Sequence, residues 1–157
     1  MGRLMEDTAL KIGKRLPAFT RPIVMENMVE FETVVWNRGR NLHSNAEAAR
    51  QDGLTRPLAS GQNQLAFLHE LLERTFGDAW VYGGKISVRY IYPVYPGDSL
   101  TIHGVVTSLD NDEGGKPKVG LEVWCENQNG QKTAVGKVTA AQPVSARSWL
   151  ESSGGAS

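Results

Sequence analysis

Apolar positions recur along the chain with two different periods, one typical of a helix and one typical of strands. Over residues 61–76, GQNQLAFLHELLERTF, leucine and phenylalanine recur at helical spacing with few polar interruptions. This spacing predicts a long and mostly buried helix. We expect its leucines to lie in the core, in particular Leu65, Leu68 and Leu72.

From residue 85 onward the period changes to two, which indicates strands. The segment KISVRYIYPVYPGDSLTIHGVVTSL predicts two strands joined at Pro96-Gly97-Asp98. The segment KVGLEVWCENQNGQKTAVGKVTAAQP predicts a second pair of strands, with Asn129-Gly130 as the hairpin turn.

The first part of the chain carries weaker signals. Residues 1–30 show little periodicity, so we expect an irregular lead-in with room for one short strand. The run FETVVW, residues 31–36, is β-branched and aromatic and predicts a strand. After the polar NRGRN turn, Ser44 or Asn45 is placed to cap a short helix over AEAARQDG that closes at Gly53.

The predicted elements form one α+β domain, in which an antiparallel sheet wraps around one long helix. A chain of 157 residues suits a single domain. We place this domain at residues 1–150, with residues 1–15 as an irregular lead-in, and expect a flexible tail at residues 151–157.

Composition narrows the classes of function. Hydrophobic residues make up 40% and charged residues 22%, as in ordinary soluble proteins. Seventeen basic and 17 acidic residues cancel, so net charge favours neither nucleic acid nor a membrane surface as a partner. Without an apolar segment typical of export or membrane insertion, we expect a cytoplasmic protein. The single cysteine, Cys125, lies in a predicted strand and is interpreted as a space-filling residue.

Candidate chemistry gathers around RNLHSNAEAARQDGLTRPLASG. His43 lies beside a turn and a short helix, and an imidazole accepts or donates a proton near neutral pH. Gly61 opens the long helix, where backbone N–H groups can hold an oxygen that gains negative charge, with Ser60 or Gln62 contributing. The plainer interpretations are a surface or capping histidine and a glycine that only fits a tight turn.

These elements, in this order, resemble the hot-dog fold, and specifically the MaoC-like group of (R)-specific enoyl-CoA hydratases and hydroxyacyl-thioester dehydratases. The resemblance covers roughly residues 15–142. Three segments carry it: RNLHSNAEAARQDGLTRPLASG, ISVRYIYPVYPGDSLTIHGVV and LEVWCENQNGQKTAVGKVTA. The first is similar to the family motif Asp-x-Asn-Pro-Leu-His, and His43 falls on its catalytic histidine. The family's Asp, Asn and Pro are replaced here by Arg38, Arg40 and Asn41, and a frequent His-Gly pair is replaced by Ser60-Gly61.

The resemblance implies an enzyme that adds or removes water at the α,β-bond of an acyl thioester, without a metal or redox cofactor. Coenzyme A or an acyl-carrier protein would then be part of the substrate. In the family the aspartate partners the water, so its loss removes a proton-transfer route typically worth about 10²- to 10⁴-fold. His69 and His103, on the predicted helix and on a strand, are interpreted as structural.

The arginines leave three interpretations open. Arg38 or Arg40 binds an acidic group of the substrate, or contacts the phosphates of coenzyme A, because a guanidinium holds either anion with two parallel hydrogen bonds. Alternatively, the missing carboxylate comes from elsewhere, such as another subunit. Arginines that merely solvate the turn are the plain alternative. Asn37 or Asn41 is placed to orient water, although neither accepts a proton.

Two other functions stay open. A hot-dog thioesterase would use a carboxylate on or facing the central helix, where Glu70 and Glu73 are available, although Glu70 is interpreted as a solvated helix position. A non-catalytic subunit would bind an acyl thioester and support an active partner. In each case we expect a homodimer or higher homo-oligomer, with a hetero-oligomer as the alternative, because a small sheet leaves edge strands that need covering.

Overall fold

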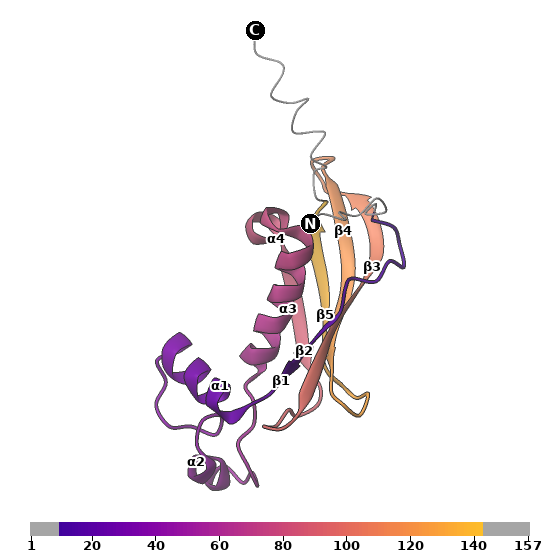
Figure 1. Ribbon diagram of the computed structural model, residues 1–157. Helices are drawn as coiled ribbons and strands as arrows, with labels where there is room; N and C mark the ends of the chain where they lie inside the picture. The colour runs from indigo at the N-terminus through magenta and orange to yellow at the C-terminus, as the bar shows by residue number, and fades with distance from the viewer. Residues whose placement is uncertain (1–9, 143–157) are drawn as a thin grey trace, which may run out of the picture.

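The structure, a computed structural model, describes residues 10–142 of the chain. A five-stranded antiparallel sheet packs one face against a long helix, α3 (Gly61–Phe76) (Figure 1). The strands follow the order β1-β3-β4-β5-β2, with β1 (Phe19–Pro22), β2 (Lys85–Tyr90), β3 (Ser99–Asn111), β4 (Pro117–Glu126) and β5 (Lys132–Ala141). This arrangement confirms the expected α+β class and the hot-dog fold. The predicted tail, residues 151–157, lies outside the described residues.

Helix α3 begins and ends where its apolar spacing predicts. Leu68 and Leu72 are fully buried against the sheet, but Leu65 is only half-buried, so that part of the prediction is wrong. The inward stripe at this end of the helix runs through positions 64, 68 and 72, four residues apart. Gln64 therefore takes the inward position that we expected of Leu65, and it is 2% exposed.

The inner face of the sheet alternates as the period of two predicts. Along β4, Val119, Leu121, Val123 and Cys125 point into the core, whereas Trp124 lies on the outer face. Cys125 fills space as expected, and burial raises the pKa of its thiol to about 12. The hairpin between β4 and β5 is also confirmed, with Gly130 at a φ of 75°.

The two strands joined at Pro96-Gly97-Asp98 do not pair with each other. β2 pairs with β5, while β3 pairs with β1 and β4, so residues 91–98 carry the chain across the sheet. Gly97, with a φ of 96°, still turns the chain into β3. The turn residues predicted the turn correctly, but strand pairing depends on contacts between residues that are distant in the sequence.

The strand predicted at residues 31–36 is wrong, because this segment is helical. Helix α1 (Met25–Glu30) continues into a π-helical turn, η1 (Phe31–Val35). Met28 and Glu32 lie four residues apart and are both buried, whereas Val34 and Val35 face outward. The β-propensity of this run is overridden by its helical burial pattern. The strand that precedes α3 is β1, inside the lead-in, where it pairs with β3.

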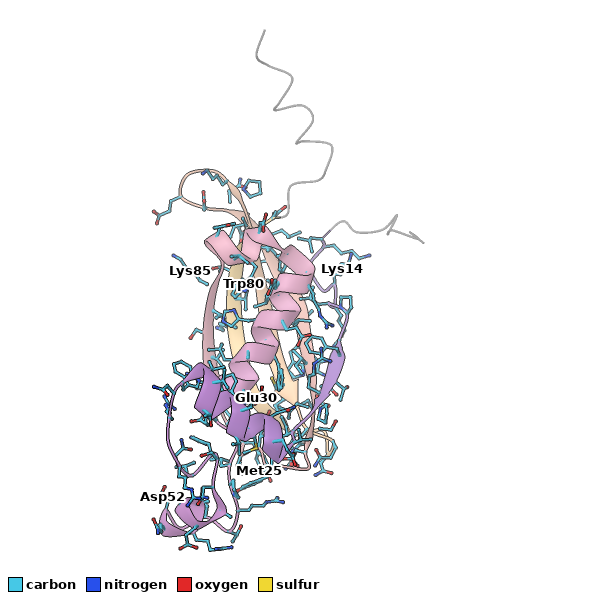
Figure 2. The ribbon with its side chains drawn as sticks, turned by 60° about the vertical axis from the view of Figure 1, so that its left-hand side comes forward. Lys14, Met25, Glu30, Asp52, Trp80 and Lys85 are labelled. Carbon is cyan, nitrogen blue, oxygen red and sulfur yellow. The ribbon has the colours of Figure 1, made fainter. Side chains whose placement is uncertain are left out.

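Short helices lie at the two ends of α3. Helix α2 (Ala46–Gln51) is capped by the Asn45 side chain, as one of the two predicted caps, and Gly53 follows it with a φ of 81°. Helix α4 (Asp78–Gly83) was not predicted. Figure 2 shows α1, between Met25 and Glu30, near the end where α3 begins, and Trp80 of α4 near the end where α3 finishes. Over residues 10–142, no helix combines the length and apolar character needed to cross a membrane.

Candidate functional site

His43 lies in the loop between η1 and α2 and is held at two points. Its ring Nδ1 lies 2.6 Å from the carbonyl oxygen of Leu58, and its backbone N–H donates to Asn41 Oδ1 at 2.8 Å. A carbonyl oxygen can only accept, so Nδ1 carries the proton of this hydrogen bond. In the neutral ring, Nε2 is then left as an unprotonated acceptor. This is the tautomer that a base requires at Nε2.

The first turn of α3 presents free hydrogen-bond donors. Ser60 is the N-cap, but its hydroxyl lies 3.0 Å from Asn63 Oδ1 and does not cap a backbone N–H. Within residues 10–142, the backbone N–H groups of Gly61 and Gln62 have no acceptor. They lie at the positive end of a 16-residue helix, where hydrogen bonding and the helix dipole both favour a negative oxygen.

Glycine at position 61 is required by a close approach. A Cβ added there would lie 2.6 Å from Cε2 of the Tyr90 ring. Burial is the main cause of a raised pKa at Tyr90, and a Coulombic contribution from Cys125 acts in the same direction. The Tyr90 hydroxyl therefore stays protonated at neutral pH and beyond.

His43 and Gly61 open into one cavity of about 350 Å³. Its walls come from the loop before α3, from the start of α3, and from the end of β2 with the residues that follow it. The lining residues are His43, Leu58, Ala59, Gly61, Gln64, Tyr90, Ile91, Tyr92, Pro93 and Val94. The cavity thus combines a base, free backbone donors and apolar walls, which suits a substrate with an acyl chain and a carbonyl that gains charge.

Gln64 is a cavity residue that the sequence analysis missed. Its Oε1 accepts from Thr133 Oγ1 at 2.7 Å, while its amide nitrogen finds no acceptor within the described part of the chain. Thr133 thereby orients the amide and leaves both N–H groups for another acceptor. The signal was present in the sequence, because a glutamine stands in the stripe 64, 68, 72 that is otherwise leucine.

The other predicted site residues do not line the cavity. Ser60 is buried, and Gln62 lies on the first turn of α3. Asn37 has a left-handed backbone with a φ of 50°. Arg40 is exposed and forms no ion pair within residues 10–142. The roles of these four residues toward a substrate remain predictions.

Arg38 and Asn41 instead contact a carboxylate that the sequence analysis did not single out. Glu32 of η1 is 1% exposed, and its Oε2 lies 3.6 Å from Arg38 Nη1 and 3.1 Å from Asn41 Nδ2. The Arg38 guanidinium also lies 5.1 Å from the centre of the Trp36 ring. The chain therefore places a carboxylate of its own beside the motif, although from a segment that we had predicted to be a strand.

The remaining candidates lie away from the cavity. Glu70 is partly exposed and also forms ion pairs with Arg21 and with Arg74, the latter at 2.5 Å. His69 Nδ1 accepts from the indole N–H of Trp80 at 3.1 Å, and the His103 ring stacks on Trp124 at 5.0 Å. Both histidines have the structural contacts that we expected.

Comparison with known proteins gives the family. The family model of the MaoC like domain matches residues 12–123. The fold is similar to an (R)-hydratase from A. caviae involved in PHA biosynthesis, with a TM-score of 0.70 and 21% identity over 86% of this chain and 98% of that one. No curated protein matches the sequence.

Two further solved structures share the fold. The R-hydratase PhaJ1 from Pseudomonas aeruginosa has a TM-score of 0.69 and 20% identity, over 85% of this chain and 83% of that one. A chain of the ChsH1-ChsH2 complex from Mycobacterium tuberculosis has a TM-score of 0.69 and 17% identity, over 85% and 99%. At these identities the likeness concerns the fold.

Proposed function

The chain belongs to the MaoC-like domain family, and from this premise we propose that it is a hydratase or dehydratase that adds or removes water at the α,β-bond of an acyl thioester. One observation carries the proposal. The unprotonated Nε2 implied by the Nδ1 contact with Leu58 belongs to a histidine that shares a cavity with the free N–H of Gly61. A base and an oxyanion donor in one apolar cavity are the groups that this reaction needs.

The proposed hydration proceeds by proton transfer through His43. Its Nε2 takes a proton from water while the water oxygen bonds to the β carbon of the enoyl thioester. The electrons of the double bond move onto the thioester oxygen, which the N–H of Gly61 holds, with the amide of Gln64 as a second donor. The α carbon then takes the proton from Nε2 as the carbonyl reforms. Dehydration follows the same steps in reverse.

The substrate carrier is coenzyme A or an acyl-carrier protein, and the reaction as written uses neither a metal nor a redox group, because addition of water involves no net oxidation or reduction. Of the two arginines in the motif, Arg40 is the one that contacts a phosphate of the carrier in this proposal, since Arg38 is engaged by Glu32. This role follows from its charge and exposure. A guanidinium binds phosphate with two parallel hydrogen bonds.

We also propose that the working unit is an oligomer joined along β2. Within residues 10–142, this strand pairs with β5 on one side only and forms one edge of the sheet. Tyr90, Ile91 and Tyr92, at its end, are each at least 44% exposed and line the cavity. A second copy or a related chain on this edge would cover the apolar residues and one wall of the cavity together.

The test is incubation with a panel of enoyl-CoA and hydroxyacyl-CoA thioesters, following the absorbance of the conjugated double bond and the release of free thiol in parallel. We expect hydration without thiol release. His43→Ala should lower kcat by about 10² or more. His103→Ala, which removes a histidine stacked on the outer face of the sheet, is the matched control and should keep kcat.

The other outcomes point to the other functions. Thiol release would indicate a thioesterase, and neither signal would indicate a subunit that binds without turnover. Near-wild-type hydration by His43→Ala would remove the proposed mechanism.

A further inference from the structure

A buried carboxylate lies under the loop that carries His43. Glu32 is 1% exposed, and its Oε1 has no hydrogen-bond partner among the described residues. Its Oε2 accepts one hydrogen bond, from Asn41, and forms an ion pair with Arg38 at 3.6 Å. Burying a carboxylate is costly, and replacing it by an apolar residue of similar size often leaves stability unchanged or higher. Fold stability alone therefore gives no reason for a glutamate here.

Two hydrogen bonds lead from this carboxylate, through Asn41, to the backbone N–H of His43, the residue that carries the base. Asn41 Nδ2 donates to Glu32 Oε2 at 3.1 Å, and His43 N–H donates to Asn41 Oδ1 at 2.8 Å. A carboxylate can only accept, so Glu32 requires the NH₂ end of the Asn41 amide to face it. The carbonyl end is then turned toward His43. Asn41 Nδ2 also lies 3.1 Å from the carbonyl oxygen of Gly39, which supports the same orientation.

We propose that Glu32 is a positioning residue for His43, acting through Asn41, and that Arg38 is its counter-ion. This inference rests on the proposed hydratase function. Glu32 does not line the cavity and is assigned no contact with substrate. The chain thus supplies, from η1, a carboxylate in place of the one that the motif lacks at position 38, and Arg38 serves that carboxylate rather than a substrate anion.

The first test separates positioning from fold stability. Glu32→Met removes the acceptor while keeping the length of the side chain in a buried place. We expect an unchanged or higher Tm together with a loss of about tenfold or more in kcat and little change in KM, because the base is displaced and the walls of the cavity remain. Glu30→Met, which changes an exposed glutamate two residues away, is the matched control and should keep kcat.

The second test reverses the hydrogen bond between positions 32 and 41. Asn41→Asp places two carboxylates against each other, and we expect a loss of about 10² in kcat. In the double variant Glu32→Gln with Asn41→Asp, the new amide at position 32 can donate to one carboxylate oxygen while the other still accepts from His43 N–H. We expect it to recover at least about tenfold over Asn41→Asp alone, which is the coupling of residues in direct contact.

The third test does not depend on activity, and so separates this inference from the proposed function. Nitrogen-15 NMR of the His43 ring should show the Nδ1–H tautomer in the wild type and a mixture of tautomers in Glu32→Met. If the wild type hydrates no thioester but the ring responds in this way, the proposed function fails and the positioning role stands. A Glu32→Met variant with wild-type kcat and an unchanged ring, or a double variant no better than Asn41→Asp, would overturn the positioning role.

Discussion

Gly61→Ala tests the start of α3, where the close approach of Tyr90 permits a magnitude to be worked out. The added Cβ would lie 2.6 Å from Cε2 and 2.7 Å from Cζ of that ring. Carbon atoms in contact prefer a separation of about 3.5–4.0 Å, so the methyl overlaps the ring by about 1 Å. Overpacking of this kind costs about 1–3 kcal/mol. Replacing a helical glycine by alanine recovers about 0.5–1 kcal/mol.

The freedom of the Tyr90 ring to move determines how much stability Gly61→Ala loses within this range. Tyr90 is 44% exposed, so its side chain has room to swing toward solvent. We therefore expect a net loss of about 1 kcal/mol, which lowers the Tm by about 2–4 °C in a chain of this size. Activity should fall much further, by about 10²-fold in kcat/KM, because the methyl and the displaced ring both crowd the N–H that holds the thioester oxygen.

The assay pairs thermal unfolding, followed by circular dichroism, with enoyl-CoA hydration. The double variant Gly61→Ala with Tyr90→Ala, compared with Tyr90→Ala alone, gives the methyl room in which to pack. We expect it to remove most of the loss in Tm and little of the loss in hydration. If the double variant regains the full hydration rate of Tyr90→Ala, glycine is needed only to admit the Tyr90 ring, and the argument that a methyl at position 61 crowds the backbone N–H is refuted.

Three further predictions concern single residues. Gln64→Leu should cost about 0.5–1.5 kcal/mol for the lost bond to Thr133 and lower kcat/KM about tenfold; wild-type kinetics in this variant would remove Gln64 from the site. Cys125 should react with a thiol reagent only after unfolding. Because burial raises the pKa of this thiol from 9.0 to about 12, the unfolded thiol ionises first as the pH rises, so the free energy of unfolding should fall between pH 9 and pH 12. Denaturant titrations should show this fall, and a smaller one in Cys125→Ala. Arg38→Asp should lower the Tm without raising the rate of hydration, since it places a second carboxylate beside buried Glu32. A gain in the hydration rate would show that the reaction uses a carboxylate at position 38 itself.

Local signals predicted the parts of the fold that local interactions determine. The bounds of α3 follow from its apolar spacing, and the hairpin between β4 and β5 follows from Asn129-Gly130. Strand pairing does not follow from local signals, so the turn between β2 and β3 was predicted but the partners of these two strands were not. The run at residues 31–36 has strand propensity, but it continues the burial pattern of α1, in which positions 28 and 32 face inward. Reading that spacing together with the preceding helix would have predicted η1 and its buried glutamate.

The residues of the candidate site also fall into those that the sequence predicted and those that it did not. His43 and Gly61 were predicted from the resemblance, and the fold brings both to one cavity. Glu32 and Gln64 were missed because each is a polar residue in an inward stripe, and the stripe is recognisable only when the helix register is known. A polar residue at such a position needs a partner, and each has one, Asn41 for Glu32 and Thr133 for Gln64.

The arginine at position 38 and the glutamate at position 32 each account for the presence of the other. Without Arg38, the Glu32 carboxylate would be buried against a single amide donor, and an unpaired buried charge is strongly unfavourable. Without Glu32, Arg38 would be a half-exposed cation over Trp36 with no reason to point inward. The pair leaves the loop near neutral charge while one carboxylate oxygen orients Asn41, and through it His43. Under the proposed positioning role, the chain keeps a carboxylate beside the motif, in the helical turn beneath the loop, where it acts on His43 through Asn41 and does not contact the substrate.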